Sequence, residues 1–515
     1  MGGLINRKLV NTLRFSGVIA FTLSSAIAVA ATPSDTLVIA KTADPQTLDP
    51  AITMDNNDWS ITYPTYQNLV RYQKGSTEVE GELAESWEAS DDNLVWTFKL
   101  RSGQQFNDGS DVDAAAVKYT FDRLMRINQG PAEPFPEGLE VVVVDPLTVE
   151  FRLPRPFAPF LNTLANNGAG IINPAVEDAE GGADQYLSAN TAGSGPFQLT
   201  KWDRGQSLVL EKNPHYGDTE PALERVVFRV VPESSARRLQ LENGDLDIVN
   251  MLPVDQIEAL QANDDLVIQE VPSLLVTYLY LNNRDGLFSD INARQAITYA
   301  IDYDGIIEGV LDNQGQQMTG PIPEGMWGHD ESLAPIKQDL DKAQSYIDQV
   351  SGAQEAVLLY SDRDPNWEPI ALTVQANMAA LGINVKLEKL ANATMRDRLD
   401  KGDFDIALGN WSPDFADPFM FMNYWFDSER GGLPGNRAFY DNAQVDELIR
   451  KAAEISDQDE RAKLYGQAQD IIMQEYPYVY LFQKAIHVGL RDNIQGYEYN
   501  PMLDDVYNVH EITKK

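Results

Sequence analysis

One segment, KGDFDIALGNWSPDFADPFMFMNYWFDS at 401–428, combines an indole, two carboxylates and a run of aromatic residues. Trp411 is followed by Asp414 and then by Asp417. Carboxylates beside flat apolar rings suit an ammonium group, because a partly desolvated carboxylate forms charge-assisted hydrogen bonds worth about 1.5 to 3 kcal/mol each. The segment therefore predicts a site for a cationic group. The alternative is a strand, a turn and an amphipathic helix whose aromatic residues are core.

A strand must position this segment. The residues from Phe404 to Leu408 alternate between apolar and other side chains, which is typical of a strand. Pro413 cannot donate to a sheet ladder, so we expect the chain to leave the sheet near Trp411. The two carboxylates then lie in the loop that follows the strand.

The sequence before this strand alternates between strands and helices, with strands at 357–360 and 383–387 and helices at 370–381 and 393–401. Ligands of open parallel sheets bind at the carboxyl ends of the strands. Arg363 follows the first of these strands, so we expect it at the same sheet edge as Trp411 and Asp414.

Elements at the two ends of the chain are also predicted. Residues 36–41 read as a strand, and residues 61–72 read as a helix that ends near Gly75. Near the other end, helices are expected at 443–455 and 458–475, the second capped by Asp457.

The first thirty residues read as a signal peptide. Three basic residues precede the apolar run GVIAFTLSSAIAVA, which ends in the small-x-small triplet Ala28-Val29-Ala30. We expect cleavage after Ala30 or one residue later. This run is too short and too rich in Ser and Thr for a membrane span, and no later run approaches the required length. We therefore expect an exported periplasmic protein that is not embedded in a membrane.

Composition excludes several classes of function. The chain has no cysteine, which rules out disulfides, thiolate metal sites, cysteine nucleophiles and a lipoprotein signal. Loss of the signal peptide changes the formal charge from −38 to −41, whereas nucleic-acid binding needs a basic face. About 485 mature residues are too many for one core, so two or three domains are expected.

Catalytic and metal-binding motifs are missing from the sequence. HExxH, GxxxxGK and GxSxG do not occur, and the four histidines are scattered. Asp362, Asp364 and Asn366 have the first spacings of a calcium loop, but Trp367 stands where glycine is needed. We expect no catalytic residue, no metal site and no cofactor. A carboxylate pair for hydrolysis arises easily by chance in so acidic a chain, and a secreted hydrolase is the alternative of another class.

Several phrases carry a family resemblance: AESW at 84–87, TFKLR at 97–101, FNDG at 106–109, GSGPFQLTKW at 193–202 and ARRLQLENGDLDIVN at 236–250. In this order they resemble the family 5 extracellular solute-binding proteins of bacterial ABC importers, the dipeptide, oligopeptide and nickel type. The resemblance runs from residue 36 to near residue 500.

The resemblance implies an α/β, two-lobed periplasmic binding protein fold of type II, cluster C, with an extra inserted domain. It places lobe 1 at 31–75, 190–280 and 487–515, the inserted domain at 76–189 and lobe 2 at 281–486, after a signal peptide at 1–30. Two strands that cross between the lobes, within 274–281 and 474–489, are expected to form a hinge.

The resemblance also implies roles for particular residues. In the family's dipeptide binders, a Trp-x-x-Asp word holds the ligand's α-ammonium, which matches Trp411 to Asp414. An Arg in the loop after an earlier strand holds the terminal carboxylate, which matches Arg363. This chain departs from the pattern, because Asp364 replaces a proline and Asp417 adds a second acid. An ion pair between Arg363 and Asp364 is the alternative.

The remaining expectations concern the rest of the ligand site. Backbone groups near Gly409 and Asn410 are expected to extend the ligand as a strand, and Met54 and Trp59 to line the opposite wall. The ligand is expected to be a short peptide, which a monomeric protein hands to membrane permease subunits. The alternatives are an opine, an oligosaccharide or a nickel chelate in the same fold, or a role as a ligand-presenting sensor partner.

Overall fold

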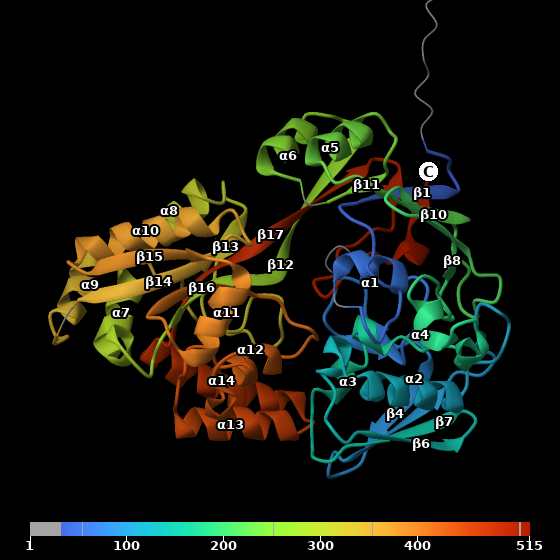
Figure 1. The fold of residues 1–515 in the computed structure, drawn as a ribbon, viewed down its shortest axis with the longest axis horizontal. Helices are drawn as coiled ribbons and strands as arrows, with labels where there is room; N and C mark the ends of the chain where they lie inside the picture. The colour runs from blue at the N-terminus through green and yellow to red at the C-terminus, as the bar shows by residue number, and fades with distance from the viewer. Residues whose placement is uncertain (1–31, 54, 251, 353, 504–505) are drawn as a thin grey trace, which may run out of the picture.

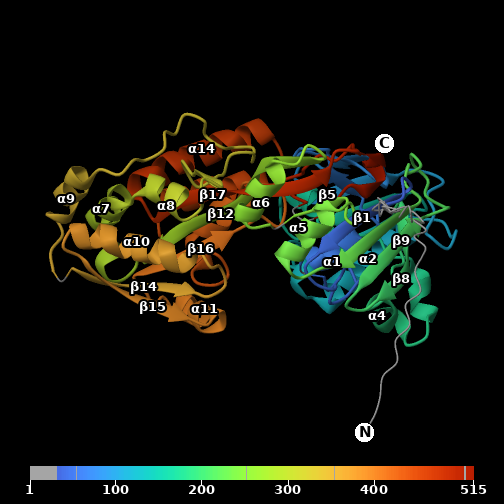
Figure 2. The same cartoon turned by 90° about the horizontal axis from the view of Figure 1, so that it is seen from above.

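The computed structural model describes residues 32–515 except residues 54, 251, 353, 504 and 505. The predicted signal peptide lies outside the described residues. Figure 1 shows two masses of chain joined by the long strands β12 (Leu266–Leu281) and β17 (Tyr478–Arg491). The same two strands bridge the masses in the view from above (Figure 2). Both expected crossing strands are therefore present.

One sheet continues through both masses in the order β15-β14-β16-β12-β17-β11-β1-β10-β9-β8. Strands β12 and β17 pair antiparallel along most of their length, with a register shift between Pro272 and Val276. Proline lacks the N–H that a ladder needs, and an irregularity of this kind bends a strand pair. This register shift lies in the connection between the two masses.

Lobe 1, as named here, contains the amino-terminal strand and its neighbours: β1 (Thr36–Lys41), β8 (Phe197–Asp203), β9 (Ser207–Lys212), β10 (Arg225–Val230), β11 (Ile248–Val249), α5 (Ser234–Glu242) and α6 (Val254–Gln261). Strand β1 has the predicted bounds and pairs in parallel with β10. Buried Leu37, Ile39 and Phe228 form part of its core. The sheet is mixed, because β9 runs antiparallel to both of its neighbours.

The predicted helix at 61–72 is wrong. Helix α1 (Asn56–Thr62) begins earlier, capped by Asp55, whose carboxylate accepts a hydrogen bond of 2.8 Å from the N–H of Asn57. Pro64 follows the helix, and proline disfavours helical continuation. The chain then enters β2 (Val70–Tyr72), which pairs with β3 (Val79–Gly81). Apolar spacing alone did not distinguish these elements.

The inserted domain, as named here, is built on a four-stranded sheet in the order β4-β5-β7-β6, with bounds Ala84–Ala89, Val95–Leu100, Thr148–Arg152 and Glu140–Asp145. Helix α2 (Ala114–Ile127) packs on it and is capped by Asp113. Edge-to-face contacts of Phe151 with Phe98 and Phe121 fill the space between helix and sheet. The short helices α3 (Phe160–Thr163) and α4 (Gly182–Leu187) follow.

Lobe 2, as named here, has the predicted alternation: β14 (Glu355–Ser361), α10 (Trp367–Ala380), β15 (Asn384–Leu390), α11 (Asn392–Lys401) and β16 (Ile406–Trp411). Its other helices are α7 (Ile291–Ala300), α8 (Tyr303–Gly309), α9 (Leu340–Ile347), α12 (Phe419–Phe426), α13 (Ala443–Glu454) and α14 (Gln458–Glu475). Asp457 caps α14, as predicted. Small elements complete the chain: β13 (Gly315–Gln317), β18 (Ile494–Gln495) and β19 (Thr513–Lys514).

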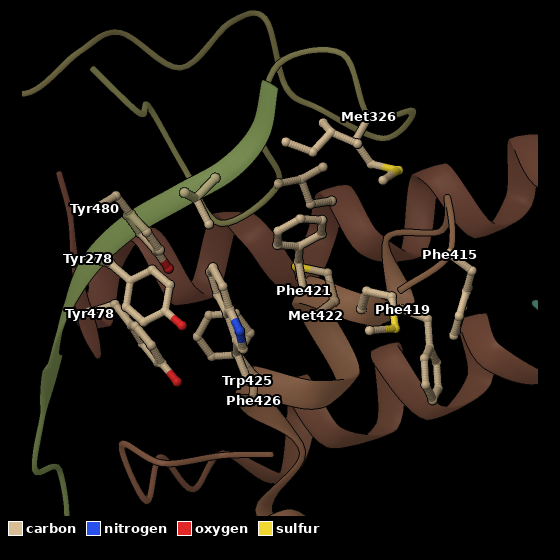
Figure 3. Packing of buried hydrophobic residues seen from close by; sticks show 14 of the residues in the cluster. Tyr278, Met326, Phe415, Phe419, Phe421, Met422, Trp425, Phe426, Tyr478 and Tyr480 are labelled. Atoms are coloured by element: carbon tan, nitrogen blue, oxygen red, sulfur yellow. The ribbon is translucent and has the colours of Figure 1, made fainter. Parts of the chain in front are cut away.

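Most of the aromatic residues that follow Trp411 are core, as the alternative interpretation expected. Figure 3 shows Trp425 of α12 beside Tyr278 and Tyr478 from the two crossing strands, and the ring centroids lie 4.6 and 5.3 Å from that of Trp425. Burial of each such side chain stabilises the fold by roughly 1.5 to 3 kcal/mol. Tyr424 is the exception within α12, because it is only half-buried.

Candidate functional site

Strand β16 delivers Trp411 to the edge of the lobe 2 sheet. It pairs in parallel with β14, where Leu358 lies opposite Ile406, and antiparallel with β12, where Val276 lies opposite Trp411. Because β14 and β16 run in the same direction, their carboxyl ends share one edge. The expectation that Arg363 and Trp411 emerge at the same edge is confirmed.

The loop after Trp411 lies where lobe 2 meets the inserted domain. The side-chain amide of Asn166 donates a hydrogen bond of 2.8 Å to the backbone carbonyl of Asp414. The amide of Asn162 donates one of 2.9 Å to the carbonyl of Ala416, whose N–H donates to the Tyr72 hydroxyl at 3.2 Å. Residues far away in the sequence therefore hold the backbone of this loop at the seam between the two masses.

The Asp414 carboxylate is exposed to solvent but is surrounded by protein from both sides of the seam. Burial of the carboxylate by this surrounding protein, together with the negative charge of Glu133 in the inserted domain, raises the pKa of Asp414 to about 6. A carboxylate whose charged form is disfavoured gains most from a cation placed beside it. This environment suits an ammonium group.

Trp411 and Tyr424 form the aromatic wall next to this loop. Their ring centroids lie 5.6 Å apart, and both residues are half-buried. The guanidinium of Arg437 lies 5.6 Å from the Trp411 ring centroid, and that of Arg430 lies 4.9 Å from the Tyr424 ring centroid. An aromatic pair flanked by two cations therefore stands beside the Asp414 loop.

The expectation that Asp417 contacts ligand needs correction. Its carboxylate has no exposed surface and accepts hydrogen bonds of 2.7 and 2.8 Å from the guanidinium of Arg461. The N–H of Phe419 also donates to it, at 2.9 Å. Asp417 therefore serves as a structural ion-pair partner that holds α14 against the start of α12.

Arg363 is exposed in the loop after β14, and its N–H donates to the hydroxyl of Ser361 at 3.3 Å. Within the described part of the chain, no carboxylate lies within 4.0 Å of its guanidinium, that of Asp364 included. Asp364 instead accepts a hydrogen bond of 2.9 Å from the N–H of Asn366. The structure therefore does not contain the alternative ion pair.

The backbone around Asn410 is partly free to pair. On one side Asn410 lies opposite Thr277 of β12, and its carbonyl accepts a hydrogen bond of 3.3 Å from Tyr278. On the other side, the pairing with β14 ends at Ala407. On the side that faces away from β12, the backbone of residues 408–411 is therefore not paired with β14.

The opposite wall was expected to include Met54 and Trp59. Met54 lies outside the described residues. Trp59 belongs to α1, is half-buried and has a solvent-shielded indole N–H without an acceptor in the described structure. Among the described residues, the backbone hydrogen bonds of Trp59 are with Asp55 and Tyr63 and not with the Asp414 loop.

A cavity of about 640 Å³ lies along the seam beside α12. Lobe 2 contributes four residues to it: Phe415, Phe419, Tyr424 and Arg430. The inserted domain contributes residues between 125 and 157, among them Glu133, Phe135, Arg155 and Phe157.

Within the described ranges, no group of three or more His, Cys, Asp or Glu side chains is arranged to hold a metal ion. None of the described helices is long and apolar enough to cross a membrane.

Sequence reasoning missed the groups that come from elsewhere in the chain. Asn162, Asn166 and Glu133 belong to the inserted domain, and no periodicity links them to Asp414. Arg430 and Arg437 follow the aromatic run, but only the folded chain places them on the rings of Tyr424 and Trp411.

Comparison with known sequences gives consistent matches. Residues 78–432 match the sequence model of the bacterial extracellular solute-binding proteins, family 5 Middle. The chain is 54% identical over 495 residues to a probable D,D-dipeptide-binding periplasmic protein of Escherichia coli K12, across 95% of this chain and 96% of that protein. It is 28% identical over 523 residues to a dipeptide-binding protein of the same bacterium, across 95% and 97%.

Comparison with solved structures agrees. HbpA2 from Haemophilus parasuis matches with a TM-score of 0.87 at 27% identity, over 93% of this chain and 100% of that one. The ABC transporter-associated periplasmic binding protein DppA from Helicobacter pylori, in complex with the peptide STSA, matches with a TM-score of 0.75 at 28% identity, over 93% and 98%. The α/β periplasmic binding protein fold of cluster C is thereby confirmed.

Proposed function

Because the chain belongs to the family 5 bacterial extracellular solute-binding proteins, which bind solutes and are not catalysts, we propose that it captures a short peptide between its two lobes. It is an ABC transporter substrate-binding protein, and the peptide would be delivered to the permease subunits of the importer. The E. coli relative at 54% identity is named for D,D-dipeptides, and the H. pylori structure holds a peptide. A dipeptide is therefore the first ligand to consider.

The observation that carries the proposal is the Asp414 carboxylate at the seam, beside the Trp411 and Tyr424 rings and with a pKa raised to about 6. A peptide's α-ammonium would stabilise the charged form of this carboxylate through charge-assisted hydrogen bonds. The Trp411 ring would pack on the first residue of the ligand. Neither interaction depends on the configuration at the ligand's α-carbon, so D and L residues are both compatible with this anchor.

Other groups would hold the rest of the peptide. Arg363 emerges at the same sheet edge as Trp411, and no carboxylate lies within 4.0 Å of its guanidinium in the described structure, which supports a contact with the ligand. The free backbone edge at 408–411, which includes Asn410, supports pairing with an extended ligand. Met54 and Trp59 remain proposed for the lobe 1 wall.

The proposal includes the protein's organisation. We place the signal peptide at 1–30 with cleavage near Ala30, lobe 1 at 31–75, 190–280 and 487–515, the inserted domain at 76–189 and lobe 2 at 281–486. The protein would act in the periplasm as a monomer. Closure would occur at β12 and β17, where the register shift lies.

A calorimetric ligand panel tests the proposal. Purified mature protein is titrated with L-Ala-L-Ala, D-Ala-D-Ala, their N-acetyl derivatives, an opine, an oligosaccharide and a nickel-histidine chelate. We expect at least one free dipeptide to bind near micromolar affinity, which corresponds to about −8 kcal/mol, and its N-acetyl derivative to bind at least tenfold more weakly. Binding of the opine, sugar or chelate with no peptide binding would overturn the peptide assignment.

The non-peptide ligands belong in the panel because other proteins with this fold have been solved with such compounds bound. Solved structures with agropinic acid and with Ni(L-His) match this chain at 23% and 21% identity, respectively, and these likenesses show the fold alone. Mass spectrometry of co-purifying compounds provides an independent check, since a ligand captured in the cell should be recovered unchanged.

A further inference from the structure

Arg437 is a half-buried cation whose charge is not balanced by a neighbouring acid. In the described structure, no carboxylate oxygen lies within 4.0 Å of its guanidinium. One amino group donates a hydrogen bond of 2.9 Å to the hydroxyl of Tyr280. Its Nε is shielded from solvent and has no acceptor among the described residues. Removing a cation from water without a counter-charge is unfavourable, so the arrangement needs a reason.

Other buried arginines of this protein show what a satisfied guanidinium looks like here. Arg123 pairs with Asp49 at 2.6 Å, and Arg461 pairs with Asp417 at 2.7 Å. Arg294 has no carboxylate partner among the described residues but donates to the carbonyls of Glu475, Phe288 and Ser289 at 2.8, 2.8 and 3.2 Å. Among the described residues, the Arg437 side chain donates one hydrogen bond, to the Tyr280 hydroxyl, which leaves donors available for an incoming anion.

The position of Arg437 places those donors beside the candidate site. Its guanidinium carbon lies 5.6 Å from the Trp411 ring centroid and 6.0 Å from that of Tyr280. Tyr280 and Tyr278 lie over Gly409, where a Cβ atom would come within 2.4 Å of the Tyr280 ring. Arg437 therefore sits above the last residues of β16, next to the indole that precedes Asp414.

We propose that Arg437 forms an anion-binding subsite that receives the carboxylate of the ligand whose ammonium group is held at Asp414. The inference rests on the proposed peptide function. A planar guanidinium binds a carboxylate through two parallel N–H donors, and partial shielding by the aromatic rings strengthens the attraction. The guanidinium of Arg437 lies 5.6 Å from the Trp411 ring centroid, which places this subsite beside the aromatic wall.

The test compares a peptide with its amide. The dipeptide that binds in the calorimetric panel is titrated as the free acid and as the C-terminal amide, against wild type, R437Q, R437K and R363Q. We expect wild type to prefer the acid by about tenfold or more, which corresponds to about 1.4 kcal/mol, and R437Q to lose that preference while binding the amide as wild type does. R437K should keep part of the preference, because it retains the charge but not the two-donor fork.

Each other result has a defined meaning. If R437Q weakens acid and amide equally, Arg437 only supports Trp411, and the subsite is overturned. The same conclusion follows if R437Q keeps the full acid preference, and loss of the preference in R363Q alone would assign the carboxylate to Arg363 instead. Thermal unfolding shows whether R437Q is folded, and R437K decides the question if it is not. Failure of the peptide function itself looks different, because wild type would then bind neither acid nor amide.

Discussion

The Asp417 carboxylate is paired with the Arg461 guanidinium at 2.7 and 2.8 Å, whereas Asp414, three residues earlier, has no cationic partner within 4.0 Å in the described structure. Two acids in one loop therefore have different roles. The paired acid holds α14 against the loop, and the unpaired acid remains available for a ligand. The Asp417–Arg461 pair also fixes the backbone of the loop from which the Asp414 side chain projects.

Asp414→Asn is expected to weaken binding of a free-amine dipeptide by about ten- to a hundredfold, because a neutral amide cannot supply the charge-assisted hydrogen bond. Binding of the N-acetylated peptide should change little. Calorimetry on both ligands checks this, and Asp397→Asn, at an exposed acid that pairs with Lys401 on α11, is the matched control. Equal loss for both ligands would show that Asp414 does not hold the ammonium.

Affinity for a free-amine peptide should fall with acidity below about pH 6. Burial and the Glu133 charge raise the pKa of Asp414 to about 6 in the free protein, so the carboxylate gains a proton as the pH falls through that value. The loss should approach about tenfold per pH unit once the carboxylate is mostly protonated. Calorimetric titrations from pH 8 to pH 4.5 measure it, and Asp414→Asn should remove the dependence near pH 6. A flat profile for wild type would contradict the assignment.

The same shift predicts how ligand-free stability depends on pH. The pKa of Asp414 is higher in the folded state than its ordinary value of 3.8, so the folded state binds the proton more tightly. This contribution to stability is fully present below pH 3.8 and is lost as the pH rises through about 6. Asp414→Asn should therefore be more stable than wild type at pH 8 and not at pH 3.5. Thermal unfolding at both pH values measures the difference, and a constant difference would refute the shift.

Removing Asp417 should damage the fold and not only the site. Asp417→Ala leaves the buried Arg461 cation without its carboxylate partner, which is expected to cost about 3 to 5 kcal/mol of unfolding free energy. The double variant Asp417→Ala, Arg461→Met should recover part of this loss, because the unpaired charge is gone. Urea unfolding of the single and double variants gives the coupling between the two side chains. If Asp417→Ala unfolds like wild type, the pair is not structural.

Gly409→Ala should disturb the tyrosines beneath the aromatic wall. The added Cβ would lie 2.4 Å from the Tyr280 ring and 2.8 Å from the Tyr278 ring, so both rings must shift. Overpacking of this kind costs about 1 to 3 kcal/mol, and displaced Tyr280 would release its hydrogen bond from Arg437. Gly466→Ala is the control, because nothing lies within 4 Å of that position in α14 and alanine should raise stability by about 0.5 to 1 kcal/mol. A neutral Gly409→Ala would show that the rings move freely.

Local patterns predicted elements well where one periodicity dominated. The strand–helix alternation of lobe 2, the cap Asp457 and strand β1 all follow from spacing and capping chemistry. The prediction failed at 61–72, where Pro64 and a short two-stranded pairing outweighed an apolar pattern that also fitted a helix. A pairing partner distant in sequence cannot be inferred from one segment's periodicity.

The sequence by itself determined the absence of cysteine, the family and the shared sheet edge of Arg363 and Trp411, because these depend on residue types and on the direction of neighbouring strands. Only the tertiary structure decided which acid is free, since Asp414 and Asp417 look alike in sequence and are distinguished by Arg461 from a distant helix. The same holds for Glu133 beside Asp414 and for Arg437 beside Trp411. The burial and the ion-pair partners of a side chain depend on contacts between segments that are distant in the sequence. These contacts form only in the folded protein, so the order of the residues does not reveal them.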